Sequence, residues 1–311
     1  MKLSLIIPCF NESKSIPVLL TRCQEFIGDR NIEIVIVDNG SNDNTPNIIK
    51  KYASDKLKLI IPKVRKGRSE ARNIGIKASE CDVVVILNAD VHLPKNFLNQ
   101  IDVLYKEGYD AVACFSQVKN LESAYARFID LNCLDRVFNG VYQKWKETIG
   151  YFWTEGFSVR KDLLMKTPLF PSNDIVPIVA GEDVRLMDGL RKYNCNGIYE
   201  ESIVVSHIAP STFKEFWYIR TGRGEGTPQI RRFIDKWSFK KIFFITMLKA
   251  IKRFIMLILV VPNFIKGYQL ARHSFKNKFF EVFTMTYVYS LEQIAMSYGE
   301  FKSFFNVYNK T

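Results

Sequence analysis

The sequence predicts an α/β protein with a mainly parallel sheet flanked by helices, followed by an α-helical carboxyl-terminal appendage. In the first part of the chain, short apolar runs rich in β-branched residues alternate with segments of helical periodicity. This alternation is typical of parallel strands joined by right-handed crossovers. Several runs stop at polar residues, and ligands of open α/β sheets bind at the carboxyl ends of the strands. From Trp237 onwards basic residues are interleaved with large apolar ones, which marks the appendage.

The apolar runs are too short for ordinary helices, so they predict strands, several of them buried on both faces. These strands are Leu3–Ile7, Ile32–Val37, Leu57–Ile61, Val83–Leu87, Asp110–Phe115 and Ile203–His207. Apolar residues at helical spacing predict helices between them. These helices are Ser15–Ile27, a segment from Asn44 towards Tyr52, Ser69–Ala78 and Phe97–Tyr105, with further helices expected within Lys119–Trp145.

The stretch Asp82–Pro94 contains the clearest candidate site. Its apolar run ends at Asn88-Ala89-Asp90, and residues i and i+2 of an extended chain point the same way. A carboxylate with an amide beside it suits an Mg²⁺ or Mn²⁺ ion that also holds phosphate oxygens. The alternative is a strand that ends in an Asx-type turn.

Composition narrows the class of partner. The 311-residue chain carries a formal net charge of +12, which favours anionic partners such as phosphorylated substrates or acidic lipid. Nucleic acid is not an expected partner, because no recognised module accompanies this charge. Six scattered cysteines without a C-x-x-C pair predict reduced, mostly buried thiols in a cytosolic compartment. No signal-peptide pattern precedes the first strand, so we expect the domain to begin at once.

Four motifs in order along the chain resemble the successive landmarks of family 2 glycosyltransferases. They are Leu5–Glu12 (LIIPCFNE), Ile36–Asp43 (IVDNGSND), Ala71–Gly75 (ARNIG) and Asn88-Ala89-Asp90. The resemblance covers roughly residues 1–235 and implies the GT-A fold, an α/β nucleotide-binding sheet. It also implies an inverting sugar transfer from a nucleoside-diphosphate sugar, with a UDP-sugar favoured.

The resemblance implies roles for residues along the donor. Pro8 and Glu12 would line its base and ribose end, and Asp38 would accept a hydrogen bond from the base, such as from the imide N–H of uracil. Arg72 would reach the diphosphate, where a planar guanidinium makes two hydrogen bonds. The alternatives are a turn residue that caps the strand for Asp38 and an exposed helix arginine for Arg72.

The family's metal motif is D-x-D, and this chain has Asn88 at the first position. Asn88 and Ala89 are therefore assigned to donor binding, and Asp90 becomes the main ligand of Mn²⁺ or Mg²⁺. The missing charge lowers the expected metal affinity, so a dispensable metal is the alternative. A late histidine completes the metal site of several GT-A enzymes, and His207 stands at the matching place, with a structural role as its alternative. His92 is expected to be a loop residue.

The segment Ala180–Leu186 (AGEDVRL) resembles the family's E-D motif opening a helix. Asp183, with Glu182 beside it, would be the general base that removes the acceptor's proton. The alternative is that both carboxylates only complement a helix N-terminus. The glycine-rich basic stretch Arg220–Gly226 is expected to be a flexible loop that closes over the diphosphate, with Arg223 offsetting the leaving group's charge.

The tail combines lysines and arginines with Phe, Ile, Leu and Met, as amphipathic helices in a membrane interface do. The strongly apolar stretch Ile242–Val261 is interrupted by Lys249, Lys252 and Arg253, and the part free of charge before Pro262, Phe254–Val261, is too short to span a bilayer. We therefore expect a catalytic domain over 1–235 and a membrane-associating tail over 236–311. The expected location is peripheral, on the cytoplasmic face of the cell membrane, with anionic lipid as partner. A helical cap on the catalytic domain and an interface for homo-oligomers are the alternatives.

The sequence thus predicts a membrane-associated glycosyltransferase that uses a lipid-linked or glycan acceptor. The alternatives are a nucleotidyltransferase on a similar fold, and a non-catalytic nucleotide-sugar-binding or membrane-scaffold protein that has lost activity through Asn88. The sugar, the acceptor and the linkage stay open.

Overall fold

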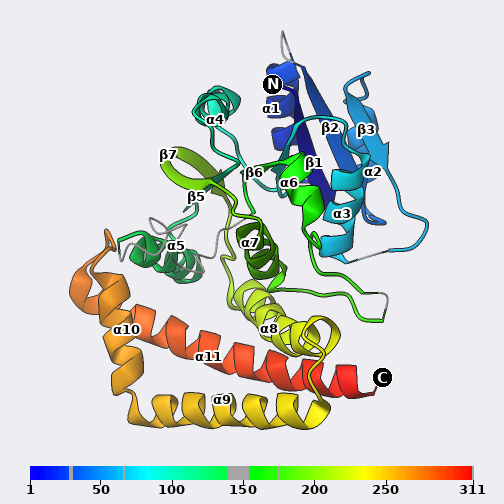
Figure 1. Cartoon of the computed structure of the whole chain (residues 1–311). Helices are drawn as coiled ribbons and strands as arrows, with labels where there is room; N and C mark the ends of the chain where they lie inside the picture. Colours follow the sequence, from blue (N-terminus) through cyan, green and yellow to red (C-terminus); the bar gives the residue numbers. More distant parts are fainter. Residues whose placement is uncertain (28–30, 66, 139–153, 174, 310–311) are drawn as a thin grey trace. The chain divides into compact units, whose positions relative to one another are not determined.

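The computed structural model describes residues 1–27, 31–65, 67–138, 154–173 and 175–309 (Figure 1). Lys66, a further sequence candidate for phosphate contact, and Trp153, which begins a family-like segment, lie outside these ranges, as does the end of the helical region expected up to Trp145. Contacts divide the chain into two units. The first comprises Met1–Gln117, Tyr142–Ser172 and Glu182–His207, and the second Val118–Val141, Asn173–Gly181 and Ile208–Thr311. The division into 1–235 and 236–311 stays a prediction.

The first unit contains a seven-stranded sheet with the order β3-β2-β1-β4-β6-β5-β7. The pairs β1–β2, β2–β3 and β1–β4 are parallel, whereas β6 pairs antiparallel with both β4 and β5. The strands are β1 Leu3–Cys9, β2 Ile32–Asp38, β3 Leu57–Ile60, β4 Val83–Ile86, β5 Ala111–Val118, β6 Phe157–Arg160 and β7 Gly197–His207. The predicted mainly parallel sheet is confirmed, and the predicted strands are present within a few residues at each end, except that β7 begins at Gly197 rather than at the predicted Ile203.

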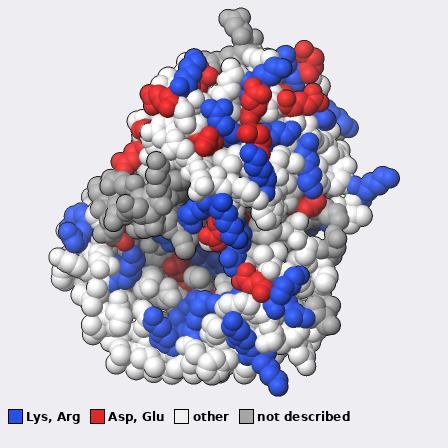
Figure 2. Space-filling view, viewed as in Figure 1, with Lys and Arg blue, Asp and Glu red and all other residues white. Residues whose placement is uncertain are grey.

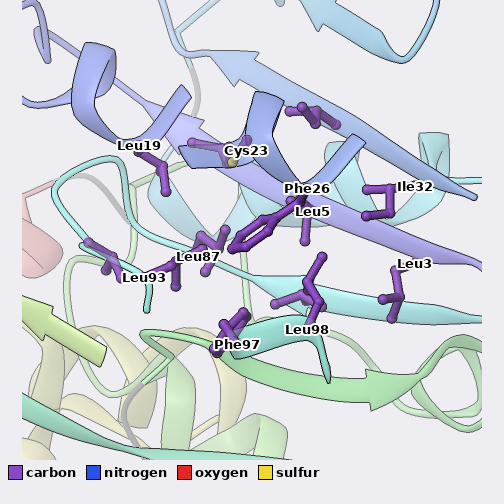
Figure 3. Close-up of a cluster of buried hydrophobic side chains, with 14 of the residues drawn as sticks. Leu3, Leu5, Leu19, Cys23, Phe26, Ile32, Leu87, Leu93, Phe97 and Leu98 are labelled. Atoms are coloured by element: carbon purple, nitrogen blue, oxygen red, sulfur yellow. The ribbon is translucent and has the colours of Figure 1, made fainter. Parts of the chain in front are cut away.

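Helices cover both faces of this sheet. The helices of the first unit are α1 Ile16–Ile27, α2 Thr45–Lys50, α3 Arg68–Ala78, α4 Phe97–Lys106, α6 Lys161–Lys166 and α7 Glu182–Lys192. Alternate residues of a strand face the same side, and those of β1, β2 and β4 pack with α1 and α4 in one apolar core (Figure 3). Helix α3 covers the other face, with Gly75 against Ile6 of β1. A sheet packed on both faces explains why its strands are continuous apolar runs.

The second unit is helical and is organised around α11. Its elements are α5 Ala124–Phe138, α8 Phe213–Gln229, the π-helical turn η1 Ile230–Ile234, α9 Phe239–Leu259, α10 Val261–Ala271 and α11 Lys278–Tyr308. Three buried glutamates of α11 form ion pairs with arginines of α5, α8 and α9. The pairs are Glu281–Arg127, Glu292–Arg220 and Glu300–Arg253, with shortest N···O distances of 2.7, 3.2 and 3.2 Å. Separating the partners of such a buried pair would leave an uncompensated charge. The three pairs therefore hold α11 in place against α5, α8 and α9. Among the described helices, none is both long and apolar enough to cross a membrane.

The glycine-rich stretch Arg220–Gly226 is not a loop, which corrects the sequence prediction. It lies inside α8, a helix that begins with a capping box formed by Thr212 and Glu215. A Cβ atom on Gly224 would lie 2.2 Å from the carbonyl oxygen of Met296 in α11, far inside van der Waals contact. The glycines therefore let two helix backbones approach closely rather than let a loop move.

Two glycines of α8 provide a test of this packing. We expect Gly224→Ala to lower the thermal midpoint, because its Cβ meets the α11 backbone and overpacking costs about 1–3 kcal/mol. Gly222→Ala is the matched control, since nothing lies within 4 Å of a Cβ there. The control should keep or raise the midpoint, because Ala is favoured over Gly in a helix by about 1 kcal/mol. Equal midpoints for the two variants would contradict the helical packing.

Candidate active site

The parallel strands β1, β2 and β4 place the loops that follow them at one edge of the sheet. The loops after β1 and β2 are joined by hydrogen bonds between Asn11 and Ser41, between Asn42 and Asn11, and between Glu12 and Thr45, at 2.8–2.9 Å. Asn11 has a φ of 57°, which asparagine tolerates better than most residues. These hydrogen bonds join the two loops to each other beside the carboxyl ends of β1 and β2.

Asp38, the last residue of β2, has two differently used carboxylate oxygens. The side chain is buried, and its Oδ1 accepts hydrogen bonds from the Ser41 backbone N–H at 3.0 Å and from the Ser41 hydroxyl at 2.6 Å. Its Oδ2 is also buried and has no hydrogen-bond partner among the described residues. A buried carboxylate oxygen without a donor is costly. Asp38 therefore holds the turn and keeps a second oxygen suited to the N–H of a ligand.

Pro8 and Glu12 lie beside this carboxylate. Pro8 is a buried residue of β1 opposite Val37. Glu12 follows the strand and accepts a hydrogen bond from the Ser15 hydroxyl. Burial raises the pKa of Glu12, and the negative charges of Asp90 and Asp43 raise it further. The structure thus brings the base-side candidates and Asp90 into one electrostatic neighbourhood.

Arg72 of α3 is the centre of the site. Its side chain is only 1% exposed, which excludes the exposed-arginine alternative. Nη1 donates to Glu182 Oε1 at 3.1 Å and to Asp183 Oδ1 at 3.3 Å. Nη2 donates to Asn88 Oδ1 at 2.9 Å and to Thr154 Oγ1 at 2.8 Å. Since these groups occupy both terminal nitrogens, direct contact with a diphosphate stays a prediction.

Asn88 joins a third carboxylate to this network. Its amide nitrogen donates to Glu155 Oε1 at 3.1 Å, while its oxygen is occupied by Arg72. Sequence reasoning gave no individual role to Thr154 or Glu155. It noted only that their segment, Trp153–Arg160, resembles the family's glycine-containing segment beside the acceptor and donor sugar. Their contacts could not be inferred, because the partners lie far away along the chain.

Glu182 and Asp183 open α7, as the E-D motif predicts. Burial raises the pKa of Asp183 to about 7, and the neighbouring Glu182 adds to this, whereas Arg72 and Arg68 oppose it. Arg68 also forms an ion pair with Glu182 at 3.2 Å. A carboxylate poised near neutrality can take up a proton at physiological pH, as a general base must.

The metal candidates form a weaker arrangement. Within the described ranges, no group of three or more His, Cys, Asp or Glu side chains could hold a metal ion. Asp90 is partly exposed and, among the described residues, makes no hydrogen bond or ion pair. His207 Nδ1 lies 3.0 Å from the Ser116 hydroxyl, and His92 forms an isolated backbone bridge with Ser206. One free carboxylate fits an Mg²⁺ or Mn²⁺ ion that takes most of its other ligands from substrate phosphates and water.

Two further donor residues predicted from the sequence are Ala89 and Arg223. Ala89 is buried between Asn88 and Asp90. Arg223 is a partly buried residue of α8 in the second unit. Its role at the leaving group therefore stays a prediction.

The chain is similar to known transferases in sequence. The model of the family described as glycosyl transferase family 2 matches residues 4–166, more than half of the chain. An undecaprenyl-phosphate 4-deoxy-4-formamido-L-arabinose transferase of Pseudomonas syringae is 31% identical over 132 residues, 40% of this chain and 38% of that protein. A poly-β-1,6-N-acetyl-D-glucosamine synthase of Staphylococcus epidermidis is 23% identical over 92% of this chain and 72% of the synthase. The chain thus matches only about a third of the length of the arabinose transferases.

Solved structures show the same fold. A mannosyltransferase of Pyrobaculum calidifontis, in complex with GDP-mannose and Mn²⁺, superposes with a TM-score of 0.67 and 18% identity, over 100% of this chain and 88% of that one. Glucosyl-3-phosphoglycerate synthase of Mycobacterium tuberculosis, in complex with Mn²⁺ and UDP, gives a TM-score of 0.52 with 16% identity over 74% and 78% of the two chains. The sheet of the first unit, the order of its motifs and the match over residues 4–166 lead to one conclusion: the chain belongs to glycosyl transferase family 2, with the GT-A fold.

Proposed function

We propose that this chain transfers a sugar, with inversion, from a nucleoside-diphosphate sugar to a hydroxyl or phosphate of a lipid-linked or glycan acceptor. The observation that carries the proposal is the buried Glu182–Asp183 pair held by Arg72 at the edge of a nucleotide-binding sheet. The unpartnered oxygen of Asp38 supports a base that offers an N–H, such as uracil, so a UDP-sugar is favoured. The names of the arabinose transferase and the glucosamine polymer synthase support the acceptor class.

The reaction is a single displacement. Asp183 accepts the proton of the acceptor as the acceptor oxygen forms its bond to C1 of the sugar. The bond from C1 to the phosphate oxygen breaks, and the nucleoside diphosphate leaves with the electron pair. Asp90, with His207 as a second ligand, would hold the divalent ion, which offsets the negative charge of the leaving group when bound. Arg223 is the proposed further cation at that group.

The tail is the proposed membrane-binding part, and α9 carries the argument. Lys249 and Arg253 of α9 turn inward to Glu300 of α11, at 3.5 and 3.2 Å. Its exposed positions are mostly large apolar residues. They include Phe243, Phe244, Leu248, Ile251, Phe254, Ile255, Ile258 and Leu259. In Figure 2 the surface at the bottom of the view, where α9 lies in Figure 1, is largely uncharged, and Lys and Arg side chains (blue) lie next to it.

A helix with apolar side chains outward fits the headgroup region of a bilayer. The exposed Lys240, Lys241 and Lys252 of the same helix add attraction to anionic lipid, about 1 kcal/mol for each lysine near the surface. We therefore propose peripheral binding at the cytoplasmic face, through α9. A homo-oligomer formed through this face is the alternative.

Asp183→Asn separates the enzyme from the non-catalytic alternative. We expect transfer from a UDP-sugar to fall by about a hundredfold or more, because an amide cannot take the acceptor's proton. Donor affinity, measured by calorimetry, should change little. Asp188→Asn, on the same helix, is the matched control and should transfer normally. Undiminished transfer by Asp183→Asn would contradict the assignment of the base.

Asp183→Asn should lower activity but raise the stability of the fold. The pKa of Asp183 lies near 7 in the folded chain and near 3.8 as its ordinary value. Between these values the folded state keeps a proton that the unfolded state has released, so this group makes the fold less stable as pH rises from about 4 to 7. We expect Asp183→Asn to raise the free energy of unfolding by about 1–4 kcal/mol at pH 8 and by less at pH 5.

Thermal or urea unfolding at both pH values measures this difference. A variant less stable than wild type at pH 8 would support the alternative, in which the carboxylate only stabilises the N-terminus of α7.

Membrane binding is tested with Ile251→Glu/Phe254→Glu. Sedimentation with phosphatidylglycerol–phosphatidylcholine vesicles should show at least about fivefold less bound protein, because two charges enter the apolar face. Tyr218→Glu is the control, since this residue of α8 is exposed and outside the proposed face. Equal sedimentation of the double variant and wild type would contradict the proposal. A change in oligomeric state without any effect of lipid would favour the oligomer alternative.

A further inference from the structure

Glu155 is a carboxylate with one committed oxygen and one open oxygen. Its Oε1 accepts a hydrogen bond from the Asn88 amide at 3.1 Å. Its Oε2 is buried and has no hydrogen-bond partner among the described residues. Buried carboxylate oxygens are normally satisfied by a donor from the protein, from water or from a ligand. The open oxygen of Glu155 is therefore a ready acceptor at the carboxyl end of β4.

The orientation of the Asn88 amide is fixed by its two neighbours. A guanidinium only donates hydrogen bonds and an ionised carboxylate only accepts them. The amide oxygen must therefore face Arg72, at 2.9 Å, and the amide nitrogen must face Glu155. An aspartate at position 88 could also accept from Arg72, but its second oxygen would then meet the Glu155 carboxylate as a like charge. Asn88 and Glu155 thus form a matched pair.

The charge of the cluster supports the same pairing. Glu182 and Asp183 contact the guanidinium group of Arg72, Glu182 also contacts that of Arg68, and Glu155 joins this cluster through Asn88. An acid at position 88 would add a fourth negative charge next to the base. The carboxylate missing from the first position of the metal motif is therefore present in the cluster, but on the chain segment before β6.

We propose that Glu155 recognises the sugar of the donor. Its Oε2 would accept a hydrogen bond from a hydroxyl or amide group of that sugar. This inference rests on the proposed function. A carboxylate repels the diphosphate, which excludes the phosphates as the partner of Glu155. The nucleobase of the donor is assigned to Asp38 at the end of β2. Glu155 also lies within electrostatic range of the proposed base Asp183. Of the donor's parts, the sugar is the one that must lie beside the general base, because the acceptor attacks C1 of the sugar there.

The test compares a UDP-sugar with UDP alone, using wild type, Glu155→Gln, Asn88→Asp and the double variant. In Glu155→Gln the amide oxygen can still accept from Asn88, but a nitrogen replaces the open acceptor. The variant should bind the UDP-sugar about tenfold or more weakly, because a hydrogen bond to a charged group contributes about 1.5–3 kcal/mol. Its affinity for UDP should stay within about twofold.

The other variants test the pair. Asn88→Asp should lower the thermal midpoint through like-charge contact. Asn88→Asp/Glu155→Gln should restore the midpoint, because the Gln nitrogen can donate to the introduced aspartate. The Gln oxygen then occupies the open position, so affinity for the UDP-sugar should recover in part relative to Glu155→Gln. A merely structural role would restore the midpoint without moving the affinity.

Three results would overturn the inference. Glu155→Gln could bind the UDP-sugar as well as wild type does, or it could lose UDP and UDP-sugar affinity equally. Either result leaves the proposed function standing while removing the role of Glu155. Wild type that binds no nucleoside-diphosphate sugar would overturn the proposed function together with this inference.

Discussion

One buried guanidinium organises the candidate site. Arg72 of α3 contacts Asn88 after β4, Thr154 before β6 and the carboxylates that open α7. A charge buried this deeply is stable only when its donors are matched by acceptors. The guanidinium therefore fixes the relative positions of four chain segments. The geometry around the proposed base is a consequence of satisfying this one group, which is why the arginine lies under the site rather than on its surface.

The second unit obeys the same constraint in a helical form. Buried arginine–glutamate pairs set where α11 lies, and glycines set how closely α8 approaches it. The sequence prediction took these glycines for signs of a moving loop, because local composition does not reveal a close contact between Gly224 and Met296, which lies 72 residues further along the chain. The Thr212–Glu215 capping box was the signal that a helix begins there.

Much of the sheet could be predicted, because strands buried on both faces must be apolar runs and polar residues after them must meet at one edge. Asp38 and Asn88 were accessible in this way, whereas the Glu182–Asp183 pair, which opens a helix, was found only through its resemblance to the family's E-D motif. The antiparallel β6 was not, because Phe157–Arg160 is four residues long and gains its place only by pairing with β4 and β5. Glu155 was missed for a similar reason, since its meaning depends on an asparagine 67 residues away.

The most direct measurement is calorimetric titration of the wild-type chain with UDP-, GDP- and dTDP-sugars, each with and without Mn²⁺, and with Asp90→Ala in parallel. The account predicts tight binding of one nucleotide class, with the UDP-sugar favoured, strengthened by Mn²⁺ and with that gain lost in Asp90→Ala. Metal-independent binding would keep the donor site but remove the metal from it. Failure to bind any of the three donors would contradict the assignment of the site as a nucleotide-sugar site.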